Sequence, residues 1–185
     1  MDELELWQQI VDGRKDSLEI IYRKYYDLLF NYGLKIYYEE DLIKDCIQDL
    51  FVKLYKSDSL KPTLNVRSYL LRAMKNIIHD RLSAKQYNIV SMDDNQFEMS
   101  ISDHDLEILF EKNDDDLLLS KKLMETYNNL PKNQKMVIYL RFIKGFSYKE
   151  IAEVMEINKQ SSMNLASRAL ANIRNKLSKL YLFFF

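Results

Sequence analysis

The sequence predicts an all-α fold, made of two small helical domains that an acidic flexible linker joins. The chain has 185 residues but 3 glycines and 2 prolines, so it holds few of the residues that form the turns of a sheet protein. Apolar residues instead recur with a helical period over long stretches. Charged residues are unevenly distributed, and that distribution indicates where one domain ends and the next begins.

The charge of the chain is balanced overall but not locally. Residues 1–87 carry 14 basic and 14 acidic side chains, residues 88–118 carry 1 and 10, and residues 119–185 carry 12 and 4. We therefore expect an N-terminal domain, an acidic linker and a basic C-terminal domain over these three ranges. The linker is too charged to bury a core. It could imitate nucleic acid inside a basic channel, or it could be a solvated tether.

The N-terminal domain shows three helical patterns, and the first two precede a polar loop at residues 57–65. The first begins at Asp16-Ser17-Leu18-Glu19, which resembles a capped helix start, and continues into an aromatic-rich apolar side that we assign to the core. The second covers residues 41–56 and has a broad apolar side. Its outward side comprises Lys44, Asp45, Gln48 and Asp49.

The third pattern, residues 66–85, has a polar side that combines cations, an amide and an imidazole. This side comprises Ser68, Arg72, Lys75, Asn76, His79 and Ser83. With Tyr69 at its boundary, the mixture suits unpaired bases through stacking, hydrogen bonds and phosphate contacts. The preceding loop, residues 57–65, is rich in turn residues and favours that interpretation. A solvated helix face would have the same composition.

The C-terminal domain contains a helix-turn-helix pattern over residues 147–176. Ser147 and Glu150 form a capping box, and Asn158 is a suitable N-cap for a second helix that starts at Lys159. Gln160, Asn164, Ser167, Arg168 and Arg174 lie on the polar side of this second helix. A basic domain is expected if the helix meets phosphates. An ordinary helical hairpin with a solvated face is the alternative.

Three segments, in order on either side of the acidic stretch, resemble motifs of one family. Residues 45–55, DCIQDLFVKLY, are similar to an Asp-Leu-Val-Gln-Glu-x-Phe-x-x-x-Trp segment. Residues 69–81, YLLRAMKNIIHDR, are similar to a Trp-Leu-x-x-Ile-Ala-x-Asn-x-x-x-Asp-x-x-Arg segment. Leu130-Pro131 and residues 146–152, FSYKEIA, resemble the start of a promoter-reading domain. The chain thus resembles the extracytoplasmic-function sigma factors, the smallest class of bacterial RNA polymerase sigma subunits, over nearly its whole length.

The resemblance implies a sigma factor that binds core RNA polymerase, through the β′ clamp helices and β, and directs promoter-specific initiation. Polymerase contacts are implied for Asp45, Gln48, Asp49 and Lys53. Contacts with the −10 element, including strand opening, are implied for Lys61, Asn65, Arg72, Lys75, Asn76 and His79. Contacts with the −35 element are implied for Lys159, Gln160, Ser161, Met163, Asn164 and Arg168. An anti-sigma factor, often membrane-anchored in this family, is a further expected partner.

The chain departs from the family pattern at the start of the second helix-turn-helix helix. Many relatives have a Thr-Val-Arg-Ser-Arg run there, whereas residues 161–165 read SSMNL, so two arginines are missing. The Arg168-Ala169 pair is kept. The bases that this helix reads at −35 therefore cannot be carried over from the family.

Enzymatic interpretations lack the residues they need. The two histidines, the single cysteine and the three glycines supply neither a zinc or di-iron ligand set nor a phosphate-binding loop. Asp45 and Asp49 could hold magnesium, but a solvated or protein-binding face is favoured. We expect no catalytic residue, metal, cofactor or small-molecule substrate. The competing functions are a free-standing helix-turn-helix regulator that binds DNA without polymerase, and a protein-binding decoy.

Localisation is predicted from the termini and the cysteine content. A single cysteine suits a reducing cytoplasm, and the acidic start Met1-Asp2-Glu3 does not resemble a secretion signal. The apolar residues 180–185 are too few to span a bilayer, so we expect them to cap the last helix or meet a partner. These features favour a cytoplasmic protein.

Overall fold

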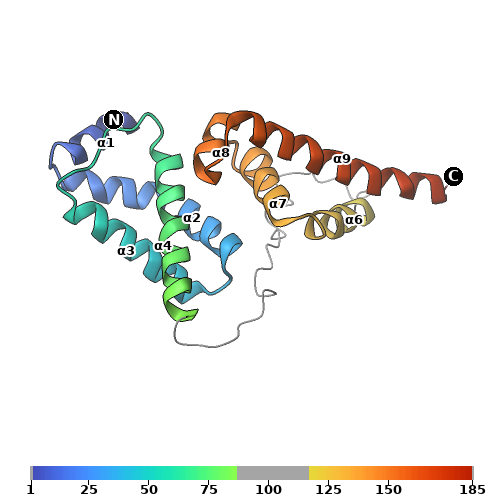
Figure 1. Cartoon of the computed structure of the whole chain (residues 1–185), viewed down its shortest axis with the longest axis horizontal. Helices are drawn as coiled ribbons and strands as arrows, with labels where there is room; N and C mark the ends of the chain where they lie inside the picture. The colour runs from blue at the N-terminus through green and yellow to red at the C-terminus, as the bar shows by residue number, and fades with distance from the viewer. Residues whose placement is uncertain (1, 87–116, 185) are drawn as a thin grey trace. The chain divides into compact units, whose positions relative to one another are not determined.

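The structure, a computed structural model, describes residues 2–86 and 117–184, and the elements in these ranges are all helices (Figure 1). The all-α prediction is confirmed for them. The chain divides into two compact units, which are described separately below. The expected acidic linker lies outside the described residues, apart from its last two positions, which begin a helix.

Four helices lie in the described part of the N-terminal unit, residues 2–86. They are α1 (Glu3–Val11), α2 (Asp16–Ile36), α3 (Glu40–Lys56) and α4 (Val66–Gln86). Helices α2, α3 and α4 pack against one another, and α1 lies against α2 and α4. Helix α1 was not among the predicted elements. Its start is nevertheless visible in the sequence, since the Glu5 side chain accepts a hydrogen bond from the Asp2 backbone N–H at 3.2 Å, which is half of a capping box.

Two details of α2 correct the sequence predictions. Its N-cap position is Lys15, with no side-chain cap, and the Ser17 hydroxyl donates instead to the Gln9 side chain of α1. The expected capped start at Asp16 is therefore wrong. The aromatic-rich side was assigned to the core, yet Ile20 and Tyr22 are 48% and 38% exposed. Part of that side faces solvent because no described helix covers it.

Gly33 fixes how closely α2 approaches its neighbours. A Cβ atom at this position would lie 2.7 Å from Ile43 Cγ2 and 3.2 Å from Met74 Cε. Such contacts would force these side chains to move, so a residue without a side chain lets the three helices pack tightly here. This close packing gives the polar sides of α3 and α4 a rigid support.

The C-terminal unit is built around one long helix. Its elements are α6 (Leu117–Asn128), α7 (Lys132–Ile138), the π-helical turn η3 (Tyr139–Ile143), α8 (Tyr148–Met155) and α9 (Lys159–Phe184). Helix α9 packs against α6, α7 and α8 (Figure 1). The side chains of residues 178–185 lie outside the described part, so the expected role of the apolar C-terminal segment is untested. Within the described residues, no helix is both long and apolar enough to cross a membrane.

Candidate nucleic-acid and protein interfaces

The outward side of α3 carries the predicted polymerase-binding residues. Asp45, Gln48 and Lys53 are exposed and Asp49 is half-buried. Both carboxylates bind Arg81 of α4. The Oδ2 atom of Asp49 accepts two hydrogen bonds from Arg81, one from Nε at 3.1 Å and one from Nη2 at 2.6 Å. The Oδ2 atom of Asp45 accepts one from Arg81 Nη1 at 3.1 Å. The hydrogen bond with Asp49 raises the pKa of Arg81 above its ordinary value. The acidic pair therefore faces a cation of its own chain.

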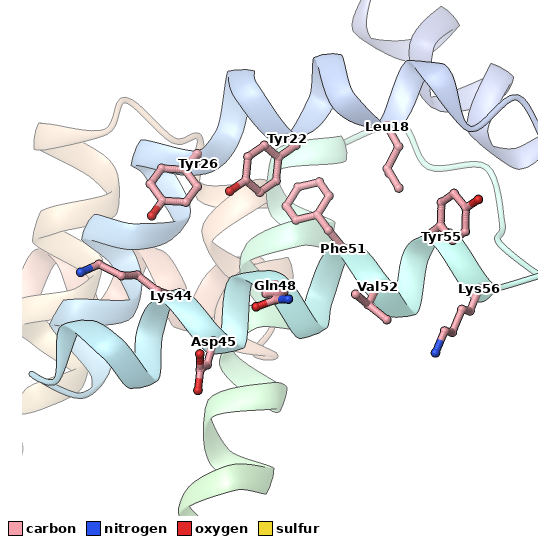
Figure 2. A pocket seen from close by; sticks show the side chains of 10 residues that line it. All are labelled: Leu18, Tyr22, Tyr26, Lys44, Asp45, Gln48, Phe51, Val52, Tyr55 and Lys56. Carbon is pink, nitrogen blue, oxygen red and sulfur yellow. The ribbon is translucent and has the colours of Figure 1, made fainter.

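Beside these residues, an open groove of about 560 Å³ runs between α2 and α3. Figure 2 shows the rings of Tyr22, Tyr26 and Phe51 between the two helices, while Asp45 points away from α2. The rings of Tyr22 and Phe51 meet edge to face with centroids 4.9 Å apart. At the other end of the groove, the Tyr55 ring is 53% exposed. The groove thus offers an exposed aromatic surface next to the polar residues of α3.

The polar side of α4 is largely as predicted. Arg72, Asn76 and His79 are exposed and Lys75 is half-buried, so all four lie on the accessible side of this helix. Ser68 is different: it is 1% exposed and its hydroxyl has no hydrogen-bond partner in the described structure. The expectation that Ser68 belongs to the exposed face is wrong, because the first turn of α4 is buried by other helices.

The loop before α4, residues 57–65, is fixed at its middle and open near its end. The indole N–H of Trp7 donates to the backbone oxygen of Lys61 at 3.1 Å. The Lys61 side chain is exposed, Asn65 is half-buried, and Leu64 is 83% exposed. Asn65 directly precedes α4, and its backbone oxygen accepts a hydrogen bond from the Tyr69 N–H at 3.0 Å. The side chains of Lys61 and Asn65 are both accessible to solvent.

The helix-turn-helix is confirmed at the level of single hydrogen bonds. The Glu150 N–H donates to the Ser147 hydroxyl at 3.3 Å, and the Ser147 N–H donates to the Glu150 carboxylate at 2.8 Å. Helix α8 ends at Met155, and its C-cap residue Glu156 has a left-handed backbone with φ 58°. Asn158 caps α9 by accepting from the Ser161 N–H at 2.7 Å. Hydrogen bonds between residues three positions apart thus fix the start of each of the two helices.

A buried serine connects the two helices of this motif. Ser162 is fully buried, and its hydroxyl lies 2.9 Å from the backbone oxygen of Tyr148 in α8 and 2.7 Å from that of Lys159. A hydroxyl can donate one of these hydrogen bonds at a time. The start of α9 is therefore held against the start of α8.

The predicted −35 residues lie along the outer side of α9. Lys159, Gln160, Met163, Asn164 and Arg168 are exposed, and Ser161 is half-buried. The amide of Gln160 donates to Asn164 at 3.1 Å, so two of them already contact each other. Leu170, further along the same helix, is also 40% exposed.

Replacing Asn158 with alanine is expected to lower the unfolding free energy of the C-terminal unit by about 1 kcal/mol, because the Ser161 N–H loses its capping partner. Thermal unfolding followed by circular dichroism measures this. Asn158→Ser is the control, since serine caps nearly as well. An alanine variant as stable as the serine variant would contradict the assigned cap.

Two protein-family models match the chain. The model of sigma-70 region 2 matches residues 21–87, and that of sigma-70 region 4 matches residues 120–173. The two matches follow the order of the two helical units, one match lying in each. The chain belongs to the sigma-70 family. Within this sigma factor, region 2 holds the α3 and α4 surfaces and region 4 holds the helix-turn-helix.

Individual relatives indicate the group within the family. The ECF RNA polymerase sigma-E factor of Haemophilus influenzae is 25% identical over 185 residues, covering 95% of each chain. That of Escherichia coli is 28% identical over 143 residues, covering 75% of each chain. With the sigma-70 matches, they identify this sigma factor as one of the extracytoplasmic-function group.

Solved structures agree on the fold. CnrH, solved in complex with the cytosolic domain of CnrY, matches with a TM-score of 0.62 at 18% identity, over 96% of this chain and 97% of that chain. RpoE from Bartonella quintana, solved with the anti-sigma factor NepR, matches with a TM-score of 0.58 at 19% identity, over 86% of this chain and 96% of that chain. At these identities the likeness concerns the fold.

The structure also places residues that the sequence analysis did not single out. Arg81 joins the acidic residues of α3, Trp7 contacts the loop before α4, and Leu64 is exposed in that loop. The capping pattern Asp2-x-x-Glu5 and the spacing of Leu6, Trp7 and Ile10 would have identified α1. No comparable local signal exists for the Arg81 contacts, since their partners lie 32 and 36 positions away.

Proposed function

We propose that this sigma factor binds core RNA polymerase and directs promoter-specific initiation of transcription. The observation that carries the proposal is the presence of both sigma-70 regions, in order, on two helical units of one chain. A free-standing regulator needs the helix-turn-helix but has no use for region 2. The RNA-synthesising chemistry belongs to the polymerase, and we propose that the protein acts in the cytoplasm without a cofactor.

Helix α3 is the proposed polymerase-docking element. Asp45, Gln48, Asp49 and Lys53 present both signs of charge and an amide on one accessible side. The aromatic groove beside Gln48 adds apolar surface, and interfaces combine such an apolar centre with a polar rim. The Arg81 contacts keep the two carboxylates in place before the polymerase arrives.

Promoter recognition is proposed to be shared between the two units. The loop of residues 57–65 and the polar side of α4 meet the −10 element, where cations contact phosphates and Asn76 contacts an unpaired base. The first turns of α9 enter the −35 major groove, as the second helix of a helix-turn-helix does. Met163 stands where the family run has its first arginine and Asn164 where it has serine, and both are exposed, so an apolar contact with a thymine methyl and an amide contact with adenine become available there.

Alanine at Lys159 or Arg168 is expected to weaken binding of the −35 duplex. A lost phosphate contact also lowers the slope of log affinity against log salt by about one unit. Fluorescence anisotropy at several salt concentrations measures both quantities. Lys176→Ala, which removes the same charge from an exposed position further along α9, is the control. Variants that bind like the control at every salt concentration would contradict these contacts.

An anti-sigma factor is a further proposed partner. The structural neighbours RpoE and CnrH were each solved with another protein, in the first case the anti-sigma factor NepR. We propose that a protein of this kind blocks this sigma factor until it is needed. The exposed aromatic groove and the polar side of α3 are the surfaces that such a protein would have to cover to prevent docking.

Binding to core polymerase separates the proposed function from a free-standing regulator. The full chain, mixed with core polymerase and passed through a size-exclusion column, should elute with the polymerase in a one-to-one ratio. A free-standing regulator elutes alone and shifts promoter DNA without polymerase. A decoy would co-elute with polymerase but fail to start transcription.

A further inference from the structure

Helix α1 precedes the part of the chain that matches sigma-70 region 2, yet it packs against α2 and α4 of the N-terminal unit. The match begins at residue 21, whereas α1 spans Glu3–Val11. Leu6, Trp7 and Ile10 are its buried side chains, and a salt bridge from Glu3 to Lys24 joins α1 to α2. The helix is therefore a firmly packed part of the N-terminal unit.

Trp7 makes two contacts that lead from α1 to the proposed −10 surface. Its indole N–H donates to the backbone oxygen of Lys61 at 3.1 Å, across 54 positions of sequence. Its ring meets Tyr69, in the first turn of α4, with centroids 5.0 Å apart and planes at 62°. The side chain is 1% exposed. One rigid side chain thus contacts both the middle of the loop and the start of the helix that follows it.

The loop depends on this contact because its other described hydrogen bonds are local. The Ser59 N–H donates to the Ser57 hydroxyl at 3.4 Å, and the Asn65 N–H to the Thr63 hydroxyl at 3.2 Å. Bonds between neighbours shape a turn but do not fix where the loop lies on the protein. The bond from Trp7 does, because its donor belongs to a packed helix.

We propose that Trp7 is a positioning residue for promoter opening, which holds the loop of residues 57–65 in the conformation that receives an unpaired −10 base. This inference rests on the proposed role of that loop at the −10 element. Trp7 itself does not touch DNA. It acts through Lys61 and Tyr69, so its loss lowers the preference for the correct base while leaving phosphate contacts in place.

The test is a comparison of binding constants for single-stranded DNA. The probes are a labelled non-template strand carrying the −10 element of a mapped start site and a scrambled strand of equal length, each bound to the holoenzyme. Trp7→Phe keeps an aromatic ring but removes the N–H donor. We expect the affinity for the −10 strand relative to that for the scrambled strand to fall about fivefold, which corresponds to the net contribution of one hydrogen bond. Affinities for the scrambled strand and for core polymerase should stay unchanged.

Two further variants keep the test decisive. Ile10→Val trims the same buried side of α1 without touching the loop, so it should keep the wild-type ratio even if it lowers stability.

Because Trp7 is the one tryptophan of the chain, benzothienylalanine, a close isostere without the N–H, can replace it in a tryptophan auxotroph if Trp7→Phe fails to fold. A wild-type ratio in the folded variant overturns the inference. Equal wild-type affinity for both strands overturns the proposed −10 role itself.

Discussion

Reversing the charge of Asp49 is expected to weaken binding to core RNA polymerase about 30-fold, or ~2 kcal/mol. Asp49 is half-buried on the outer side of α3 and accepts two hydrogen bonds from Arg81. Asp49→Arg removes the carboxylate from the docking surface and places a second guanidinium beside Arg81. Titration of labelled core polymerase with the variant measures the loss.

Two controls separate docking from local damage. Asp49→Asn removes the negative charge without adding repulsion, and should cause a smaller loss in the same direction. Asp27→Arg makes the same change of net charge at an exposed position of α2, and should bind core polymerase as the wild type does. An Asp49→Arg variant that unfolds like the wild type and binds core with unchanged affinity would remove Asp49 from the interface.

Replacing Asn76 with alanine is expected to lower the fraction of open promoter complexes at least tenfold. Extruding a base costs a few kcal/mol, and an amide that bonds its exposed edge returns ~1–3 kcal/mol of this. Asn76 is exposed on the polar side of α4, where it can make such bonds. Permanganate reactivity of −10 thymines measures opening directly, while closed-complex binding should remain.

A pre-opened template tests the cause of this defect. If unpairing limits the variant, a promoter mispaired at −10 should restore much of its activity. Asn31→Ala, which removes the same amide from an exposed position of α2, should open the duplex promoter normally. Equal thymine reactivity for Asn76→Ala and wild type on the duplex promoter would exclude Asn76 from the opening step.

Local chemistry made part of this structure predictable. The capping box of Ser147 and Glu150 and the cap at Asn158 involve residues three positions apart, so they can be read from sequence and proved correct. Helix α3 was likewise expected almost to its bounds. Its buried apolar residues recur with a helical period along the whole element, and polar residues occupy the positions between them.

Burial and long-range pairing were less predictable. A helical period indicates which residues share a face but not how many neighbours cover that face. Helix α4 packs against α1, α2 and α3, so its buried side is broader than one stripe and includes Ser68. The Trp7 contact with Lys61 and the Arg81 contacts with α3 join residues far apart in sequence, and no local pattern indicates them. The predicted DNA and polymerase contacts stay predictions, since they concern partners.

Transcription with purified components tests the central claim most directly. Core polymerase is incubated with genomic fragments from the organism that encodes the chain, with and without the full-length protein, and the 5′ ends of the transcripts are sequenced. We predict a discrete set of start sites that depend on the protein and share sequence elements near −10 and −35. The same 5′ ends with and without the protein, despite its binding to core polymerase, would contradict the assignment as a promoter-directing sigma factor.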